Sequence, residues 1–345
     1  MPKSSDLLND PLTLAPPPSF HPEALRQVLS EQYGLEGRLE PLGGERDRNL
    51  RLILADGAVF LVKLAHPDED PAITDFQTAA LLHLEEADAA LPVPRMRRTR
   101  EGATAIPHSA GDGRPCLLRV LTFLPGQPMT EAAGPGRAHD LGGLTARLNR
   151  ALAGFAHPAD TRRLIWDLRE APALRALLPN VAEPVLRDLA SAALDRFEAE
   201  AAPLLARLPE QVIHNDLNPH NVLVEAGDPT RLAGIIDFGD MVRASRLQEV
   251  ATTCAYLLRP GPAPLAGPAA FLAGYRAVLP LPEEEAALLP RLIATRMAMT
   301  VLITSWRARR QPENATYILR NMPGARAGLE WLTQASPRTL PPHEE

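Results

Sequence analysis

Two short apolar segments, each followed at once by acidic and amide residues, constrain the fold of this chain more than any other feature. Residues 212–224 read VIHNDLNPHNVLV, and residues 234–240 read GIIDFGD. Apolar runs of this length between turn residues predict buried strands. We therefore expect short core strands whose ends present Asp216, Asn221 and Asp237.

These polar residues supply the groups that phosphoryl transfer requires. Transfer from a nucleotide needs a residue that orients a hydroxyl and a metal ion that bridges the phosphates. Asp216 is placed to accept the proton of the attacking hydroxyl. The amide oxygen of Asn221 and the carboxylate of Asp237 are hard ligands of the kind that Mg²⁺ prefers. The pattern therefore favours a magnesium-dependent phosphotransfer site.

Lys63 extends the same interpretation to the first part of the chain. It lies in an otherwise apolar strand at residues 58–64, where a buried ammonium group is costly unless an anion is close. We expect a nucleotide phosphate to be that anion. The glycine-bearing turn at residues 42–49 offers backbone NH groups to phosphates, although two glycines between elements are more often simply a turn.

Two other interpretations of the polar residues stay open. Paired carboxylates such as Asp216 and Asp237 also build two-metal phosphohydrolases, but those sites normally gather more His and Asp ligands. His214 and His220 are a candidate metal pair. A turn that contains proline separates them, which favours instead a buried His214 that holds the loop through hydrogen bonds.

Composition narrows the partners and the compartment. The net charge of −6 is spread along the chain without a basic block, which argues against nucleic acid and anionic membranes as partners. Cys116 and Cys254 lie in apolar surroundings and form neither a disulfide framework nor a metal motif. We find no signal-peptide pattern and no span of about 20 apolar residues. We expect a cytoplasmic protein with buried free thiols.

The pattern of elements changes at residues 125–128, PGQP. Before it, an Asp-Gly turn joins predicted strands at 49–54 and 58–64, and a further strand is expected at 115–124. After it, helical periodicity covers residues 140–155, 185–208, 247–258, 269–278, 283–309 and 315–332. We predict an α+β fold with a flexible extension at residues 1–18, a small antiparallel-sheet lobe at 19–124 and a larger, mostly helical lobe at 125–345.

Several motifs carry a family resemblance. HNDLNPHN followed by IIDFGD resembles the catalytic signature of the aminoglycoside phosphotransferase and choline kinase group, the small-molecule relatives of protein kinases. GERDRN at 44–49, FAHP at 155–158, WDL at 166–168 and DFGDM at 237–241 are most similar to the hydroxylysine kinase-like phosphotransferases. The resemblance covers nearly the whole chain after the extension and implies a bilobal, protein-kinase-like fold.

The resemblance implies roles for residues in both lobes. Lys63 would hold the phosphates of ATP or GTP, and Leu121 to Phe123 would meet the adenine. The remaining nucleotide candidates are Gly44, Arg46 and Asn49. Asp216 would be the catalytic base, with Asn221 and Asp237 as the ligands of Mg²⁺.

Two positions depart from the family pattern. Gln77 stands where many of these kinases have a glutamate that pairs with the lysine, so the partner of Lys63 is open. Asn215 replaces the glycine that is common between His and Asp, and we expect it to affect local backbone shape more than chemistry.

Substrate candidates are Asp240, Arg243, Arg296 and Trp306. Arg243, Arg246 or Arg296 would clamp a substrate carboxylate if it faced the pocket. For Arg296 and Trp306, which lie on a late helix, the alternative is a solvated arginine and a packed tryptophan. Asp240 or Glu249 would meet a substrate amine, although Glu249 equally suits the first turn of its helix.

We therefore predict a phosphotransferase that moves the γ-phosphoryl group of ATP or GTP, with Mg²⁺, to a hydroxyl of a small molecule. The expected acceptor is an amino alcohol or hydroxy amino acid, hydroxylysine-like, or an aminoglycoside; homoserine, choline and ethanolamine are alternatives. Protein substrates are not expected, because few residues separate Gly239 from the helix near Leu247. Alternatives of another class are an inactive nucleotide-binding pseudokinase, supported only by Gln77, and the metal-dependent phosphohydrolase.

Overall fold

The computed structural model describes residues 7–8, 12, 15–44, 46–129, 134–259 and 261–334. The chain divides into two compact units: Met1–Pro125 with His157–Ala159, and Gly126–Ala156 with Asp160–Glu345. Three residues from the later sequence thus join the first unit. Most of the expected extension, residues 1–18, lies outside the described residues. At its end, the carbonyl oxygens of Pro17 and Pro18 accept hydrogen bonds from the Arg48 guanidinium at 3.3 and 2.9 Å.

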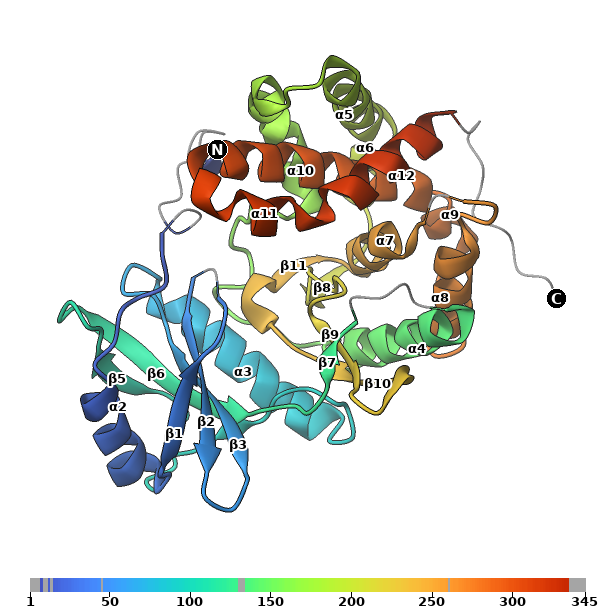
Figure 1. Ribbon diagram of the computed structural model, residues 1–345. Coiled ribbons are helices and arrows are strands. Elements are labelled where there is room, and N and C mark those ends of the chain that lie inside the picture. The colour runs from blue at the N-terminus through green and yellow to red at the C-terminus, as the bar shows by residue number, and fades with distance from the viewer. Residues whose placement is uncertain are drawn as a thin grey trace. The chain divides into compact units, whose positions relative to one another are not determined.

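The first unit is built on an antiparallel sheet (Figure 1). The order of strands is β1 (Gly37–Pro41), β2 (Arg48–Leu54), β3 (Val59–Leu64), β6 (Pro115–Thr122) and β4 (Met96–Arg97), and β5 (Ile106–Ser109) also pairs with β6. Gly57 in the β2–β3 turn has φ +86°, which glycine adopts without steric cost. Lys63 of β3 pairs with Asn49 of β2 and with Arg119 of β6. The sheet therefore carries a row of polar residues across its central strands.

Two helices complete the first unit. α2 (Pro22–Val28) continues as a π-helical turn over Leu29–Tyr33 and ends at Gly34, whose φ is +66°. Its Leu25 packs into the core beside Leu50 and Val62 of the sheet. α3 (Pro71–Ala87) begins after Asp70, whose carboxylate accepts a hydrogen bond from the NH of Ala72 at 2.9 Å.

The second unit is mostly helical. Its helices include α4 (Pro135–Ala151), α5 (Pro184–Arg196), α6 (Ala202–Leu205), α7 (Arg246–Leu257), α8 (Ala266–Arg276), α9 (Glu283–Ala286), α10 (Leu289–Arg310), α11 (Ala315–Ile318) and α12 (Met322–Gln334). α4 and α8 approach closely at Gly142 and Gly274. A Cβ atom there would lie 1.9 Å from the carbonyl oxygens of Phe271 and His139, respectively, so the contact requires glycine on both helices.

Short antiparallel strands interrupt these helices. β9 (Val222–Glu225) lies between β10 (Asp228–Ile235) and β7 (Gln127–Pro128), and β8 (Glu210–Ile213) pairs with β11 (Val242–Ser245). Ile213, Val222 and Ile235 are fully buried, as expected for core strands.

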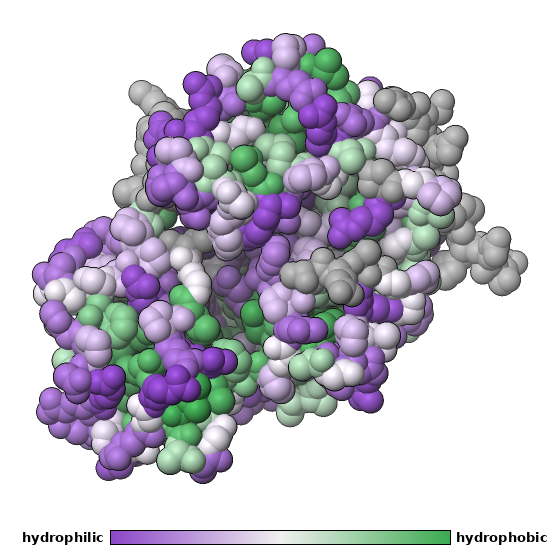
Figure 2. Space-filling model, viewed as in Figure 1, coloured by the Kyte–Doolittle hydropathy of each residue, from purple (hydrophilic) through white to green (hydrophobic). Residues whose placement is uncertain are grey.

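α10 is a core helix of the second unit. The segment Glu283–Arg310 is long and apolar enough to cross a membrane by length and composition, so the expectation that no such stretch exists was wrong. However, 78% of its most apolar window is buried inside the structure, which indicates a core helix. α10 packs against α5, α7 and α12. On the face drawn in Figure 2, hydrophilic and hydrophobic residues are mixed over the described surface.

The predicted α+β class is confirmed, with a sheet-rich first unit and a helical second unit. Individual helix bounds differ from the prediction. The helix expected over 283–309 is interrupted after Ala286, just before Pro290, because proline has no NH to continue the hydrogen-bond ladder. Residues Leu168–Asn180 form a 3-10 helix that contains Pro172 and Pro179 and was not predicted.

Candidate active site

Two pairs of antiparallel strands position the loop at residues 214–221, here called the polar loop. Val222 of β9 lies opposite Ile235 of β10, and the NH of Ile236 donates to the carbonyl oxygen of Asn221 at 2.9 Å. Asn221 precedes β9 and Asp237 follows β10, so strand pairing brings both residues to the same end of the ladder.

His214 fastens the polar loop to the core. It is buried, its Nε2 atom hydrogen-bonds the carbonyl oxygen of Ile236 at 3.0 Å, and its Nδ1 atom accepts from the NH of Asp216 at 3.3 Å. This pairing requires the neutral ring with the proton on Nε2, in agreement with burial, which lowers the pKa of His214. His214 is therefore a structural residue of the loop, as predicted.

Asp216 is held by three side chains. Its Oδ1 atom lies 3.1 Å from Nη2 of Arg296, and its Oδ2 atom accepts from the amides of Asn218 at 2.9 Å and Asn221 at 2.8 Å. The Asp216 side chain is 23% exposed, so a reactant can still reach it. Burial raises the pKa of Asp216 to about 7, and Arg296 opposes this rise. A fixed carboxylate of this basicity is suited to accept a proton from a hydroxyl near neutral pH.

Asn221 and Asp237 offer hard oxygen ligands at the same end of the β9–β10 ladder. The amide nitrogen of Asn221 donates to the backbone and side chain of Asp216 at 2.9 and 2.8 Å, which fixes Oδ1 as the oxygen left for a metal ion. Asp237 accepts a hydrogen bond from the NH of Gly239 at 3.2 Å. The described residues contain no cluster of three or more His, Cys, Asp or Glu suited to a metal. This donor set fits an ion whose remaining ligands are phosphate oxygens and water, the usual mode for Mg²⁺.

Glu249 supports the backbone of the polar loop. It is fully buried, and its carboxylate accepts from the NH groups of His214 at 2.6 Å and Asn215 at 3.1 Å. Asn215 has φ +68° and Asp237 has φ +64°, a left-handed conformation that non-glycine residues adopt mainly when they are Asn or Asp. Glu249 lies in the first turn of α7, which is one of the two roles considered for it, and its carboxylate also supports the polar loop.

Arg296 is the buried partner of Asp216. Its side chain is 1% exposed; besides Asp216 it donates to the carbonyl oxygen of Trp166 at 2.8 Å, and its guanidinium lies 4.7 Å from the centre of the Trp166 ring. The alternative of a solvated arginine was therefore wrong for Arg296. The signal in the sequence is a single arginine in the middle of an apolar helix.

The other substrate candidates are placed differently. Arg243 forms an ion pair with buried Asp160 at 2.7 Å, and this contact engages its guanidinium. Trp306 is 4% exposed and packs against Arg310, with 5.1 Å between the guanidinium and the ring centre. Both are structural residues here. Asp240 lies close enough to Asp216 to raise its pKa, so it belongs to the same electrostatic environment.

In the first unit, Lys63 has a protein partner. Its Nζ atom lies 3.1 Å from Oδ2 of Asp47, and Arg119 lies 3.7 Å from the same oxygen. Gln77 accepts from Arg119 at 2.9 Å. The expectation that a phosphate supplies the anion for Lys63 thus overlooked Asp47. The β2–β3 register places Asn49 opposite Lys63, and Asp47 lies just before β2, so strand pairing alone does not identify Asp47 as the partner.

The remaining nucleotide candidates also lie in the first unit. The side-chain amide of Asn49 donates to the carbonyl oxygen of Gly43 at 3.3 Å and closes the turn before β2. A Cβ atom on Gly44 would lie 2.6 Å from the carbonyl oxygen of Asp47, so this turn requires glycine. Arg46 is close enough to lower the pKa of Asp47. Leu121 pairs with Leu61 in the sheet, and the NH of Phe123 donates to Val59 at 3.4 Å.

Comparison with known proteins identifies the family. The phosphotransferase enzyme family, APH, matches residues 38–288. Hydroxylysine kinase of Mus musculus is 26% identical over 326 residues, which cover 88% of this chain and 86% of that protein. Homoserine kinase of Azorhizobium caulinodans is 32% identical over 259 residues, 73% of this chain and 75% of that protein.

Solved structures share the fold. A microcompartment-associated aminopropanol kinase superposes with a TM-score of 0.64 at 20% identity, over 91% of this chain and 98% of that chain. An amicoumacin kinase in complex with AMP-PNP and Ca²⁺ superposes with a TM-score of 0.65 at 16% identity, over 88% of this chain and 93% of that chain. The family match spans most of the sequence and includes the polar loop. The chain therefore belongs to the APH phosphotransferase family and is a phosphotransferase that acts on hydroxyl groups of small molecules.

Proposed function

We propose that the protein transfers the γ-phosphoryl group of ATP or GTP to the hydroxyl of a small hydroxylated amino acid or amino alcohol, with Mg²⁺ as the metal ion. The geometry of Asp216 carries this proposal, because three donors fix a carboxylate that remains partly exposed. The names of the similar hydroxylysine and homoserine kinases support the acceptor class.

In the proposed reaction, Asp216 acts as the base. The acceptor oxygen forms a bond to the γ-phosphorus while the bond from that phosphorus to the β–γ bridging oxygen breaks. The nucleoside diphosphate leaves, and the hydroxyl proton passes to Asp216. Arg296 and Asn218 keep the carboxylate in place for this step.

Asn221 and Asp237 are the proposed metal ligands. Bound Mg²⁺ would neutralise charge on the phosphates. The rest of the nucleotide site is proposed to come from the first unit. There, Lys63 would contact the phosphates, with the turn that carries Gly44, Arg46 and Asn49, and Leu121 and Phe123 would meet the base.

The structure weakens the two alternatives from other classes. The pseudokinase interpretation rests on Gln77, but Asp47 gives Lys63 a carboxylate partner at 3.1 Å without a glutamate at position 77. A two-metal phosphohydrolase needs a larger set of ligands than Asn221 and Asp237, and the part of the chain that the structure describes holds no cluster of three His, Cys, Asp or Glu.

A coupled assay of nucleotide consumption tests the proposal. It compares ATP and GTP over a panel of hydroxy amino acids, amino alcohols and aminoglycosides, with Mg²⁺ present or removed by chelation. Asp216→Asn is expected to abolish acceptor-dependent turnover. Asp195→Asn, a change at a carboxylate that is 63% exposed, is the matched control and is expected to retain it. Phosphate release that needs no acceptor would instead indicate a hydrolase, and nucleotide binding without turnover would indicate a pseudokinase.

A further inference from the structure

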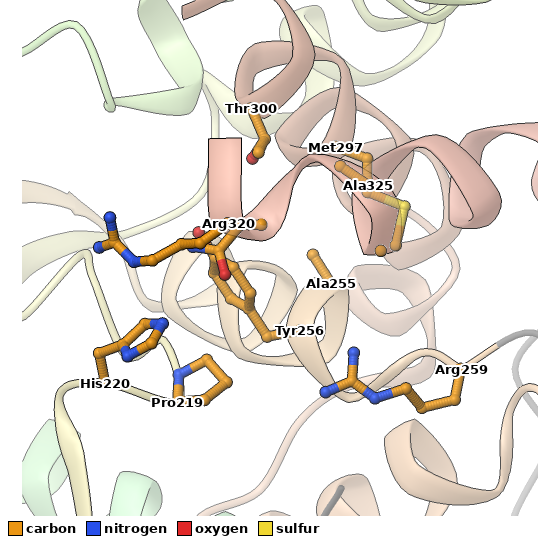
Figure 3. A pocket seen from close by; sticks show the side chains of 11 residues that line it. Pro219, His220, Ala255, Tyr256, Arg259, Met297, Thr300, Arg320 and Ala325 are labelled. Carbon is orange, nitrogen blue, oxygen red and sulfur yellow. The ribbon is translucent and has the colours of Figure 1, made fainter. Parts of the chain in front are cut away.

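A pocket of about 240 Å³ lies within the second unit beside the polar loop (Figure 3). Pro219 and His220 of the polar loop form one wall. The others come from α7 and Arg259 just after it, from α10, from the 3-10 turn that holds Arg320 and Asn321, and from the start of α12. This volume lies just below the usual range for the pockets of drug-sized ligands, about 300–1,000 Å³, so the pocket has room for a smaller molecule.

The charged side chains that line this pocket are both arginines, Arg259 and Arg320, and no acidic residue lines it. In Figure 3 the guanidinium of Arg259 points into the pocket. Within the described residues, the Arg259 side chain has no carboxylate partner, and burial lowers its pKa. Gly324 also lines the pocket, and a Cβ atom there would make an ordinary van der Waals contact with Nη1 of Arg259 at 3.7 Å. Arg259 is therefore an arginine without a carboxylate partner among the described residues, and it points into the pocket.

Arg320 forms a second positive wall. Its guanidinium stacks on Tyr317 at 3.8 Å from the ring centre and donates to the Tyr317 carbonyl oxygen at 2.9 Å. Its Nε atom is buried and has no hydrogen-bond partner in the described part of the chain. His220 of the polar loop lines the same pocket.

Two chains of hydrogen bonds link residues that line the pocket to Asp216. The NH of His220 donates to the side-chain oxygen of Asn218 at 2.8 Å, and the amide of Asn218 donates to Asp216 at 2.9 Å. On the other side, Tyr256 lines the pocket and hydrogen-bonds Arg296, which holds Asp216 at 3.1 Å. A ligand in the pocket therefore lies against the residues that position the proposed base.

We infer that this pocket, called the arginine pocket, binds the carboxylate of the acceptor through Arg259, with Arg320 adding positive potential. The inference rests on the proposed function and narrows it. The acceptor is then a hydroxylated amino acid that presents its carboxylate to Arg259 and its hydroxyl to Asp216. An amino alcohol lacks the anion, and an aminoglycoside would bring several ammonium groups to a pocket that has two arginines and no acid.

The test compares acceptors that differ only in the carboxylate. Hydroxylysine and homoserine are each measured beside the amino alcohol that remains after removal of the carboxylate, with wild type, Arg259→Met and Arg259→Lys. Loss of a charge-assisted hydrogen bond is expected to raise KM for the amino acid about 10- to 100-fold in Arg259→Met, with kcat changed by less than about threefold. Arg259→Lys is expected to restore part of the loss because it keeps the charge.

The controls separate this inference from other effects. Arg231→Met changes an exposed arginine of the same unit, with a side chain that is 69% exposed, and is expected to leave every parameter unchanged. The KM for ATP is expected to stay the same in Arg259→Met. A rise in that KM would overturn the inference, because it would assign the pocket to a nucleotide phosphate. Equal turnover of the amino acid and its decarboxylated counterpart would also overturn it while leaving the kinase proposal standing.

Calorimetry keeps the inference testable if no acceptor is phosphorylated. Binding of each amino acid to the full chain is measured in wild type and Arg259→Met. Binding that needs both the carboxylate and Arg259, without turnover, would support the pocket and contradict the proposed reaction. Absence of binding and of turnover for both hydroxy amino acids would overturn the inference together with the proposed acceptor class.

Discussion

Replacement of Asp47 by asparagine would test the partner of Lys63. Asp47 is 8% exposed; its Oδ2 atom lies 3.1 Å from Lys63 and 3.7 Å from Arg119, which is itself 1% exposed. Removal of one member of a buried ion pair costs about 3–5 kcal/mol, because the remaining charge stays buried without compensation. Asparagine still accepts a hydrogen bond, so we expect a loss of about 3 kcal/mol, at the lower end of that range.

The same substitution has a defined pH dependence. Burial opposes ionisation of Asp47, but Lys63 and Arg119 outweigh it and lower its pKa from 3.8. A carboxyl with a lowered pKa in the folded state stabilises the protein fully above its unfolded pKa and loses that contribution as the pH falls through the folded value. The difference in unfolding free energy between wild type and Asp47→Asn should thus be largest at neutral pH and shrink in acid.

The assay must report on the first unit. Trp166, Trp306 and Trp331 all lie in the second unit, so tryptophan fluorescence does not follow it. Hydrogen exchange of the β2, β3 and β6 amides, measured by mass spectrometry, gives the local unfolding free energy of this sheet. In steady-state kinetics, the KM for ATP is expected to rise about tenfold in Asp47→Asn, because Lys63 loses its orientation. Asp56→Asn, in the exposed β2–β3 turn, is the control. If Asp47→Asn lowers the unfolding free energy by less than about 1 kcal/mol and leaves the KM unchanged, Asp47 is not the residue that stabilises Lys63.

Further predictions concern the second unit. Arg296→Met is expected to lower kcat about 100-fold in steady-state kinetics, with KM for ATP unchanged, because a displaced base loses alignment. Asn215→Gly is expected to keep activity and to raise the unfolding free energy, measured in urea, by about 1 kcal/mol. Glycine adopts φ +68° without strain, and the buried Asn215 amide has no hydrogen-bond partner among the described residues. Burial raises the pKa of Glu249 from 4.5 to about 7, so its contribution to stability is full below pH 4.5 and is lost as the pH rises through 7. The unfolding free energy of the wild type, relative to that of Glu249→Gln, should therefore fall by about 3 kcal/mol between pH 4.5 and pH 7. Urea titrations followed by tryptophan fluorescence measure this difference. Arg243→Met should leave the acceptor KM unchanged and lower the urea midpoint, because Arg243 pairs with Asp160 at 2.7 Å.

The local part of the site could be predicted from the sequence. Asp216 and Asn221 are five residues apart in the loop before β9, and Asp237 follows β10, the partner strand of β9. Short apolar runs and antiparallel pairing therefore suffice to place these three residues. The same local signals gave the sheet of the first unit, where the Asp-Gly turn fixes the register. Helix ends were less predictable, since Pro290 interrupts one continuous apolar pattern and two prolines turn residues Leu168–Asn180 into a 3-10 helix.

The sequence by itself determined the class of fold, the chemistry of the polar loop and the phosphotransferase family. Only the tertiary structure decided which distant residues support that chemistry. Arg296 lies 80 residues from Asp216, and Asp160 lies 83 residues from Arg243, so neither contact follows from any local period. Asp47 takes the partner role beside Lys63 that the family pattern gives to the position of Gln77. The physical reason is that backbone periodicity fixes which face a residue occupies, whereas ion pairing in a buried site depends on which helices pack against that face.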